Sequence, residues 1–174
     1  MKNHLLALKL PLFLVLTVFV TSGVQAAKAE SDADRKSLAE KSIEVINTGN
    51  MELAAAVYST GIKLHLVDQI KPLVEGLEGI NENANFLRTA YPDMKFVVTD
   101  IMVSGDKVIT VTNFTGTNTG PRGDMPPTAK KVDFSGVLIS QVVDGKITEQ
   151  WAYTNMASLY RQLGFTITPP SAGK

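Results

Sequence analysis

The 174-residue chain contains no cysteine, one tryptophan and only two histidines. Without cysteine it can form neither disulfides nor a lipid anchor at a modified cysteine, so its fold must be held together by packing alone. It has no excess of charge either, because 17 basic residues balance 17 acidic ones. With no basic surplus and no arginine-rich patch, we expect no nucleic-acid partner.

Metal ligands are equally scarce. His65 is the only histidine beyond the N-terminal segment, and the carboxylates show no zinc or calcium spacing. A G-x-S-x-G elbow for serine-based hydrolysis is absent from the sequence. The sequence therefore predicts no metal site and no serine hydrolase.

The N-terminus has the three parts of a secretory signal peptide: Lys2 and Lys9, an apolar run over residues 10–20, and small residues around Ala26. The apolar run is about half of the roughly 20 residues that cross a bilayer, so we expect no stable membrane anchor after cleavage. We predict cleavage after Ala26, with Ala29 as the alternative, and a periplasmic or secreted protein. Cleavage would remove two basic residues and no acidic ones, which leaves a net charge of −2.

Residues 27–167 have the length of one domain with one sizeable core. Residues 168–174 contain two prolines and a glycine and are expected to form a flexible tail. The predicted domain organisation is therefore a signal peptide over 1–26, one domain over 27–167 and the tail.

Hydrophobic periodicity and capping residues predict a helix from Ser31 to Gly49, a short helix over 51–58, and a third helix over 80–91 ended by Pro92. The pattern predicts strands over 62–67, 95–103, 107–117, 130–143 and 147–155, with a loop over 68–79 and a short helical end near Leu159. Ser104-Gly105-Asp106 and Asp144-Gly145 are hairpin turns, which make the neighbouring strands antiparallel. Helices first and strands afterwards predict an α+β domain, a cone in which a curved antiparallel sheet wraps over N-terminal helices around an apolar cavity.

In the last predicted strand, alternation places one set of side chains on a shared face. That set consists of Ile147, Glu149, Trp151, Tyr153 and Asn155. An aromatic face with a carboxylate and an amide is either a core with satisfied polar groups or the wall of a ligand cavity.

Several segments, taken in order, resemble the SnoaL-like polyketide cyclases, also called ester cyclases. They are G-L-E-G-I at 76–80, Y-P-D at 91–93, F-T-G-T-N-T-G at 114–120, P-P-T-A-K at 126–130, D-G-K-I-T-E-Q-W at 144–151 and R-Q-L-G at 161–164. The resemblance covers residues 38–164 and implies a nuclear transport factor 2-like fold, with a deep apolar cavity and a homo-oligomeric assembly. It also implies intramolecular aldol ring closure without metal or organic cofactor, in which an acid/base group in the cavity moves the proton.

Three residues depart from that family's pattern. Asn118 stands where the family has histidine, Ala129 where it commonly has glycine, and Asn155 where it tends to have aspartate. An amide cannot titrate, so Asn155 could only donate or accept hydrogen bonds.

Proton abstraction beside a carbonyl needs a base and a donor that stabilises the enolate oxygen. We select His65, Glu149 and Asn155 as catalytic candidates, with Asp68 as an orienting partner for His65. Each has a structural alternative: an exposed strand histidine, a carboxylate paired with Lys or Arg, or an amide satisfied by backbone. Convergence of the three on one cavity would support a catalytic site.

The predicted cavity-binding residues are Trp151, Tyr153, Phe114, Phe86 and Asn118, with Thr117 and Arg122 at the rim of the entrance. For the aromatic residues, burial in an ordinary core is the competing interpretation.

Three functions remain open at this stage. The protein is an exported cyclase or isomerase acting on a small hydrophobic carbonyl compound, a non-catalytic carrier of such a molecule in the same cavity, or a structural module that assembles through its sheet.

Overall fold

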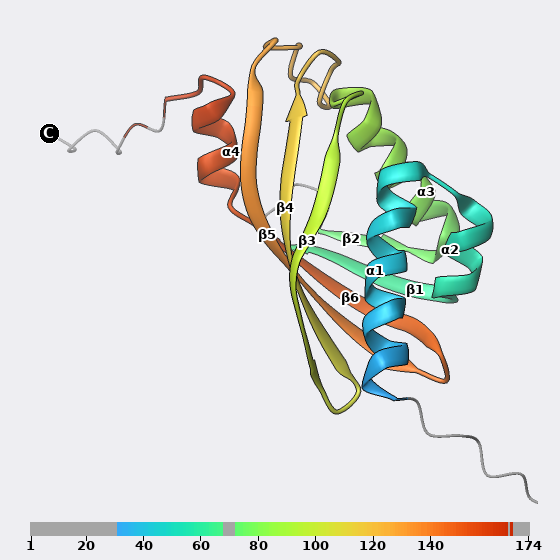
Figure 1. The fold of residues 1–174 in the computed structure, drawn as a ribbon. Helices are drawn as coiled ribbons and strands as arrows, with labels where there is room; N and C mark the ends of the chain where they lie inside the picture. The colour runs from blue at the N-terminus through green and yellow to red at the C-terminus, as the bar shows by residue number, and fades with distance from the viewer. Residues whose placement is uncertain (1–30, 68–71, 167, 169–174) are drawn as a thin grey trace, which may run out of the picture.

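The computed structural model describes residues 31–67, 72–166 and 168; the predicted signal peptide, both cleavage sites and Asp68 lie outside this range. Four helices and six strands follow one another along the chain (Figure 1). They are α1 (Asp32–Thr48), α2 (Met51–Val57), β1 (Tyr58–Val67), β2 (Leu73–Glu75), α3 (Gly76–Ala90), β3 (Lys95–Ser104), β4 (Lys107–Thr117), β5 (Lys131–Val143), β6 (Lys146–Thr154) and α4 (Met156–Gln162).

The first two helices begin and end at the residues that the sequence indicated. Ser31 and Asp34 form a capping box at the start of α1, and Gly49 ends the helix with a φ of 70°. The side chain of Asn50 then accepts hydrogen bonds from the backbone N–H groups of Glu52 and Leu53 at the start of α2. Local capping interactions therefore set both ends of α1 and the start of α2.

The six strands form one sheet in the order β2-β1-β6-β5-β4-β3. All neighbours are antiparallel except β1 and β6, which run parallel. Gly105 (φ 60°) lies in the β3–β4 turn, and Asp144 and Gly145 (φ 48° and 74°) form the β5–β6 turn, as Asp-Gly pairs favour. The hairpins are confirmed, and the parallel pair joins the first strand to the last.

The predicted loop over 68–79 was wrong within its described part. Leu73–Glu75 forms β2 beside β1, and α3 begins at Gly76 rather than near residue 80. Gly76 has a φ of 70°, which lets the chain turn directly from strand to helix. A three-residue strand is too short to show an alternating pattern, so no periodicity could predict it.

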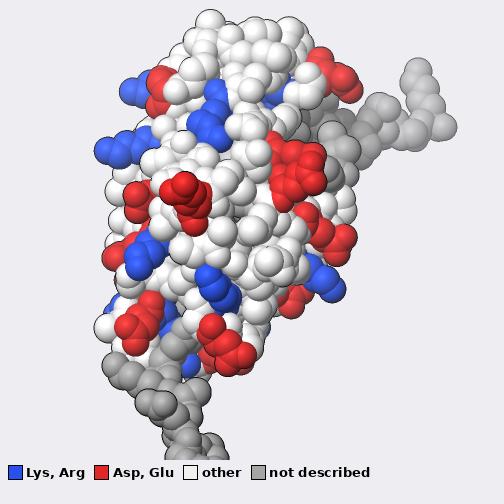
Figure 2. Space-filling model, turned by 90° about the vertical axis from the view of Figure 1, so that its right-hand side faces the viewer, with Lys and Arg blue, Asp and Glu red and all other residues white. Residues whose placement is uncertain are grey.

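Helices α1, α2 and α3 lie together on one side of the sheet (Figure 1). Val45, Ala54, Ile62 and Ile80 are fully buried in the core between these helices and the sheet. The side chain of Asn47 ties α1 to β3: its amide donates to the carbonyl of Phe96 (2.9 Å) and accepts from the N–H of that residue (2.8 Å). On this helical side, basic and acidic side chains are interspersed over the surface (Figure 2).

A bulge decides which way the β6 side chains point. Val142 pairs with Ile147 and Gln141 with Glu149, so Thr148 is an extra residue with no partner on β5. The alternation shifts by one at this residue, and the buried positions become Ile147 and then Gln150. The prediction that Ile147 shares a face with Glu149 and Trp151 was therefore wrong, whereas Glu149 and Trp151 do share one.

Candidate functional site

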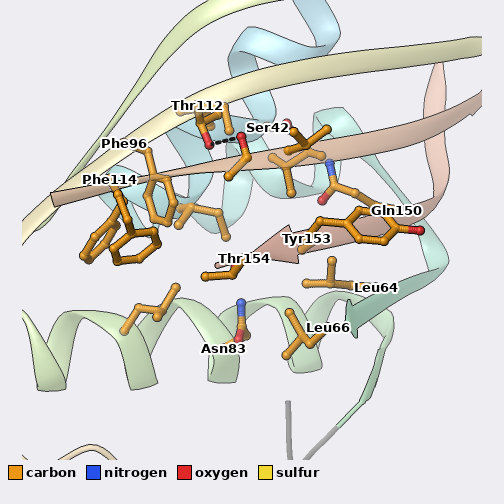
Figure 3. A pocket seen from close by; sticks show the side chains of 18 of the residues that line it. Ser42, Leu64, Leu66, Asn83, Phe96, Thr112, Phe114, Gln150, Tyr153 and Thr154 are labelled. Atoms are coloured by element: carbon orange, nitrogen blue, oxygen red, sulfur yellow. Dashed lines mark hydrogen bonds between the residues drawn. The ribbon is translucent and has the colours of Figure 1, made fainter. Parts of the chain in front are cut away.

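A cavity lies between the inner face of the sheet and the helices (Figure 3). Its volume is about 100 Å³, several times the ~10–15 Å³ that one water molecule needs. All of its walls come from elements that are far apart in the sequence. The residues that line it are Ser42, Ile43, Ile46, Tyr58, Leu64, Leu66, Asn83, Leu87, Tyr91, Phe96, Thr112, Phe114, Arg122, Phe134, Gly136, Val137, Leu138, Gln150, Ala152, Tyr153, Thr154, Met156 and Leu159.

Phe114 is the centre of an aromatic wall at one end of the cavity. Its ring lies 4.7 Å from the ring of Phe96, 4.9 Å from that of Phe134 and 5.3 Å from that of Tyr91, measured between centroids. Edge-to-face and offset contacts of this kind add to the energy of apolar burial. Phe114, which was predicted as a cavity-binding residue, is one of the residues that line this cavity.

A few neutral polar side chains interrupt the apolar lining. Gln150 donates its amide to the hydroxyl of Ser140 (2.8 Å), and Ser42 donates to the carbonyl of Ala39 (2.7 Å). Thr112 contacts the carbonyl of Gly136 at 3.4 Å, and Asn83 rises from α3 toward the strands (Figure 3). Amides and hydroxyls in an apolar cavity fix the orientation of a ligand through its own polar atoms.

Two buried phenols also face the cavity. Burial raises the pKa of Tyr58 well above its ordinary value, and the hydrogen bond with Ser42 lowers it only in part. Burial likewise raises the pKa of Tyr91, the charge of Arg122 lowers it, and Tyr160 raises it. Both phenols therefore keep their protons at neutral pH and can donate hydrogen bonds to a ligand oxygen.

The loop between β4 and β5 lies against the end of α3, at the top of Figure 1. Arg122 belongs to this loop, lines the cavity, and lies between the ring of Phe86 on α3 (5.8 Å) and that of Tyr160 on α4 (5.9 Å). Phe86 is itself 38% exposed and contributes no wall to the cavity. It was predicted to line the cavity, and it instead supports a residue that does.

Asn118 organises this loop from inside. Its amide donates to the carbonyls of Ala90 and Gly120, and its carbonyl accepts from the N–H and hydroxyl of Thr128. The side chain is 2% exposed and lies outside the cavity lining. The predicted cavity-binding position of Asn118 was therefore wrong, because its side-chain amide is fully engaged in hydrogen bonds within the loop and to α3.

The base of the loop is held by Asp93, which accepts hydrogen bonds from the backbone N–H (2.6 Å) and the hydroxyl (2.7 Å) of Thr117. Both hydrogen bonds lower the pKa of Asp93, and the bond from the Thr117 hydroxyl has the larger effect. The predicted rim residue Thr117 thus anchors the end of β4, and it does not line the cavity.

His65, Glu149 and Trp151 come together on the opposite, outer face of the sheet. His65 Nε2 lies 2.7 Å from Glu149 Oε1, and the His65 ring stacks on Trp151 with centroids 5.3 Å apart and planes 7° from parallel. Lys107 Nζ lies 4.7 Å from the centroid of the same indole. The structure brings two of the three catalytic candidates together but places them away from the cavity, because Leu64 and Leu66 point inward from β1 and the bulge turns Glu149 outward.

Asn155 does not join them. Its side chain caps α4 by accepting from the N–H of Ser158 at 2.9 Å, and it borders a shallow outer hollow with Val111, Ser135 and Tyr153. Tyr153 is 44% exposed and contributes to both this hollow and the inner cavity. The three catalytic candidates do not converge on one cavity.

Sequence reasoning missed Ser42, Asn83, Thr112, Gln150 and Tyr91. Gln150 was assigned to the wrong face because the bulge at Thr148 is invisible in the alternating pattern. Ser42 could have been found from the sequence, because it falls among the apolar positions of α1 that recur at helical spacing. In the structure it is buried, at 2% exposure. Within the part of the chain that the structure describes, no helix is long and apolar enough to span a membrane, and no three His, Asp or Glu side chains gather as a metal site.

Comparison with known proteins identifies the family. The profile of the SnoaL-like polyketide cyclases matches residues 36–163. No curated protein matches the chain.

Several solved structures share the fold. One from Bacillus cereus, assigned as a polyketide cyclase, is 30% identical, with a TM-score of 0.64 over 77% of this chain and 83% of that one. One from Jannaschia, assigned as a SnoaL-like polyketide cyclase, is 19% identical, with a TM-score of 0.70 over 81% and 100%. A nuclear transport factor 2-like protein from Burkholderia pseudomallei is 10% identical, with a TM-score of 0.63 over 76% and 98%. The curved, unclosed sheet is thus nuclear transport factor 2-like, and the chain belongs to the SnoaL-like polyketide cyclase family.

Proposed function

We propose that this protein is exported and binds a small, mostly apolar carbonyl compound in the inner cavity. The observation that carries the proposal is an aromatic cavity whose lining includes neutral donors and acceptors, among them Asn83, Gln150 and the two phenols. A carbonyl oxygen accepts hydrogen bonds from such groups, and the apolar body of the compound removes the aromatic wall from water.

Binding is favoured over turnover by the chemistry of the lining. Among the described residues that line the cavity, none is Asp, Glu or His. Asn155 stands at the position of the family's acid and caps a helix. We therefore place carriage of the compound first and cofactor-free cyclase or isomerase chemistry second, the latter supported by family membership.

Carriage is tested by filling the cavity. Ala152→Phe places a ring among Leu66, Leu138 and the other lining residues, and Ala157→Phe, on the exposed surface of α4, is the matched control. Native mass spectrometry of protein purified from its own compartment should show a retained small molecule on the wild type and the control, and none on Ala152→Phe. Equal retention by all three proteins would contradict the proposed cavity.

Catalysis is tested on the outer pair. If the family's acid/base chemistry operates here through His65 and Glu149, then His65→Ala and Glu149→Gln must each lower turnover of an identified compound at least tenfold. If both variants still convert an added carbonyl compound at the wild-type rate, His65 and Glu149 take no part in the reaction. An added compound recovered unchanged from the wild type would favour carriage.

We also propose that the protein self-associates through the outer face of its sheet. Paired positions place a row of side chains across this face from β3 to β1: Met102, Ile109, Ile139, Trp151 and His65. Met102 is 47% exposed and Val97, on the same edge strand, 44%. Exposed apolar side chains on one face of a sheet favour a protein–protein interface.

Self-association is tested by a charge at the centre of that face. Ile139→Lys should convert a dimer to a monomer in sedimentation velocity at micromolar concentration, and Val143→Lys, equally apolar but at the hairpin end of β5, should leave the dimer intact. A wild-type protein that sediments as a monomer would overturn this proposal.

Export is tested separately. N-terminal sequencing of protein recovered from a periplasmic fraction or the medium should give Ala27 as the first residue. A protein that retains Met1, or that remains in the cytoplasm, would contradict it.

A further inference from the structure

Arg122 carries an unsatisfied donor into the cavity. Its Nε is buried and has no hydrogen-bond partner, and no acidic side chain in the described residues forms an ion pair with it. A guanidinium is charged at every physiological pH and presents its donors in a rigid fork. A buried donor without an acceptor costs free energy, and native structures rarely leave one.

The hydroxyl of Tyr91 is a second orphan in the same cavity. Tyr91 is 1% exposed, lines the cavity, and its oxygen has no hydrogen-bond partner. Burial raises the pKa of this phenol and the charge of Arg122 lowers it in part. Both orphan groups line the same cavity, and both are donors at neutral pH.

Arg122 is held in place before any ligand arrives. Backbone hydrogen bonds join it to Met125 in both directions (3.0 and 3.2 Å), and two aromatic rings flank its guanidinium. The loop is also pressed onto α3, because a β-carbon at Gly120 would overlap the carbonyl oxygen of Thr89. A cation held at the end of an apolar cavity loses little entropy when it binds an anion.

We propose that Arg122 and Tyr91 form a subsite for the carboxylate of an amphiphilic ligand whose apolar body lies against Phe114 and Phe134. A carboxylate accepts two hydrogen bonds from a guanidinium fork and a third from a phenol. Its single negative charge balances the single positive charge of Arg122, whereas a neutral carbonyl would leave that charge unpaired. This inference rests on the proposed binding function and narrows its ligand to carboxylic acids.

Three probes with one hydrocarbon body separate the alternatives: 3-phenylpropanoate, its methyl ester and 3-phenylpropan-1-amine. By calorimetric titration at neutral pH, we expect the acid to bind the wild type at least tenfold more tightly than the ester, and the amine to bind most weakly. Arg122→Gln should reduce the affinity for the acid to that for the ester while changing the affinity for the ester less than twofold. Arg161→Gln removes the same charge from exposed α4 and should leave both affinities within twofold of the wild type.

Tyr91→Phe keeps the test decisive if Arg122→Gln folds poorly. Removing an orphan hydroxyl should leave the free energy of unfolding unchanged or raise it, while weakening binding of the acid severalfold. In ¹⁵N-labelled protein, the Arg122 Nε–Hε signal, assigned by its loss in Arg122→Lys, should shift on addition of the acid and not of the ester.

The outcomes distinguish the two proposals. Equal binding of acid and ester, or an unchanged Arg122 signal, would overturn the carboxylate subsite and leave the carbonyl-binding cavity standing. Binding of none of the three probes would contradict both.

Discussion

The two faces of the six-stranded sheet carry opposite kinds of chemistry. The inner face has Phe114 at 2% exposure and neutral amides, hydroxyls and phenols around a cavity. The outer face has a histidine, a glutamate and a lysine gathered at Trp151, with His65 and Glu149 side chains 31% and 36% exposed.

The difference shows that the most reactive side chains of a chain need not lie where a ligand can be enclosed. On the outer face the titratable groups are paired with each other. In the cavity beside the inner face, Arg122 Nε and the Tyr91 hydroxyl have no hydrogen-bond partner. An unpaired buried donor is a stronger indication of a ligand than a titratable pair that already satisfies itself.

The largest expected effect comes from the inner face. Phe114→Ala should lower the free energy of unfolding by about 3–5 kcal/mol, because it removes a ring that contacts three other aromatic rings and leaves a cavity. Urea denaturation monitored by Trp151 fluorescence measures it. Phe86→Ala, at a position 38% exposed, is the control, with an expected loss below about 1 kcal/mol. If the two variants lose similar free energies of unfolding, Phe114 contributes no more to stability than the exposed Phe86.

Asn118→Ala tests the loop that carries Arg122. We expect a loss of about 2–3 kcal/mol, because the side-chain amide of Asn118 makes four hydrogen bonds that join the loop to the end of α3 and to Thr128. Asn113→Ala removes an amide that donates to Asp133 on the outer face and should cost below about 1 kcal/mol. If Asn113→Ala proves the more destabilising, the loop is not organised as described.

Ala129→Gly should stabilise the protein by up to about 1 kcal/mol. Ala129 has a φ of 55°, a conformation that costs an alanine roughly 1–2 kcal/mol and a glycine almost nothing, less the entropy that glycine loses on folding. Ala55→Gly in exposed α2 should instead destabilise by roughly 0.5–1 kcal/mol. A lower midpoint of thermal unfolding for Ala129→Gly would show that this backbone is not strained.

The smallest effect belongs to the outer pair. A double-mutant cycle with His65→Gln and Glu149→Gln should give a coupling energy below about 1 kcal/mol, since both side chains are about one-third exposed and solvent screens their attraction. A coupling of several kcal/mol would mean that the pair is buried in an assembly, which links this measurement to the Ile139→Lys experiment.

Helix caps and hairpin turns were predictable because they depend on neighbours in the chain. Ser31, Gly49, Asn50 and Asp144-Gly145 each act within a few residues, and they placed most helices and strands within a few residues of their observed ends. The resemblance of several segments to SnoaL-like proteins predicted a nuclear transport factor 2-like fold, and the family match and the solved structures confirm that fold. Phe114, predicted as a cavity-binding residue, lies in a strand whose alternation is regular and lines the cavity.

The candidate site was less predictable. The bulge at Thr148 places Glu149 and Gln150 on the faces opposite to those predicted. No local sequence feature marks this bulge. Asn118 and Phe86 looked available for a ligand, but their partners lie on other elements and are known only once those elements meet.

The sequence by itself determined the α+β class, the order of helices and hairpins, and the replacement of an expected acid by Asn155, because these follow from local conformational preference and residue identity. Only the tertiary structure decided that Arg122 and Tyr91 share a cavity while His65 and Glu149 share the opposite face. The physical reason is that sheet register and the packing of a long loop on α3 determine which side chains meet and which donors remain unpaired.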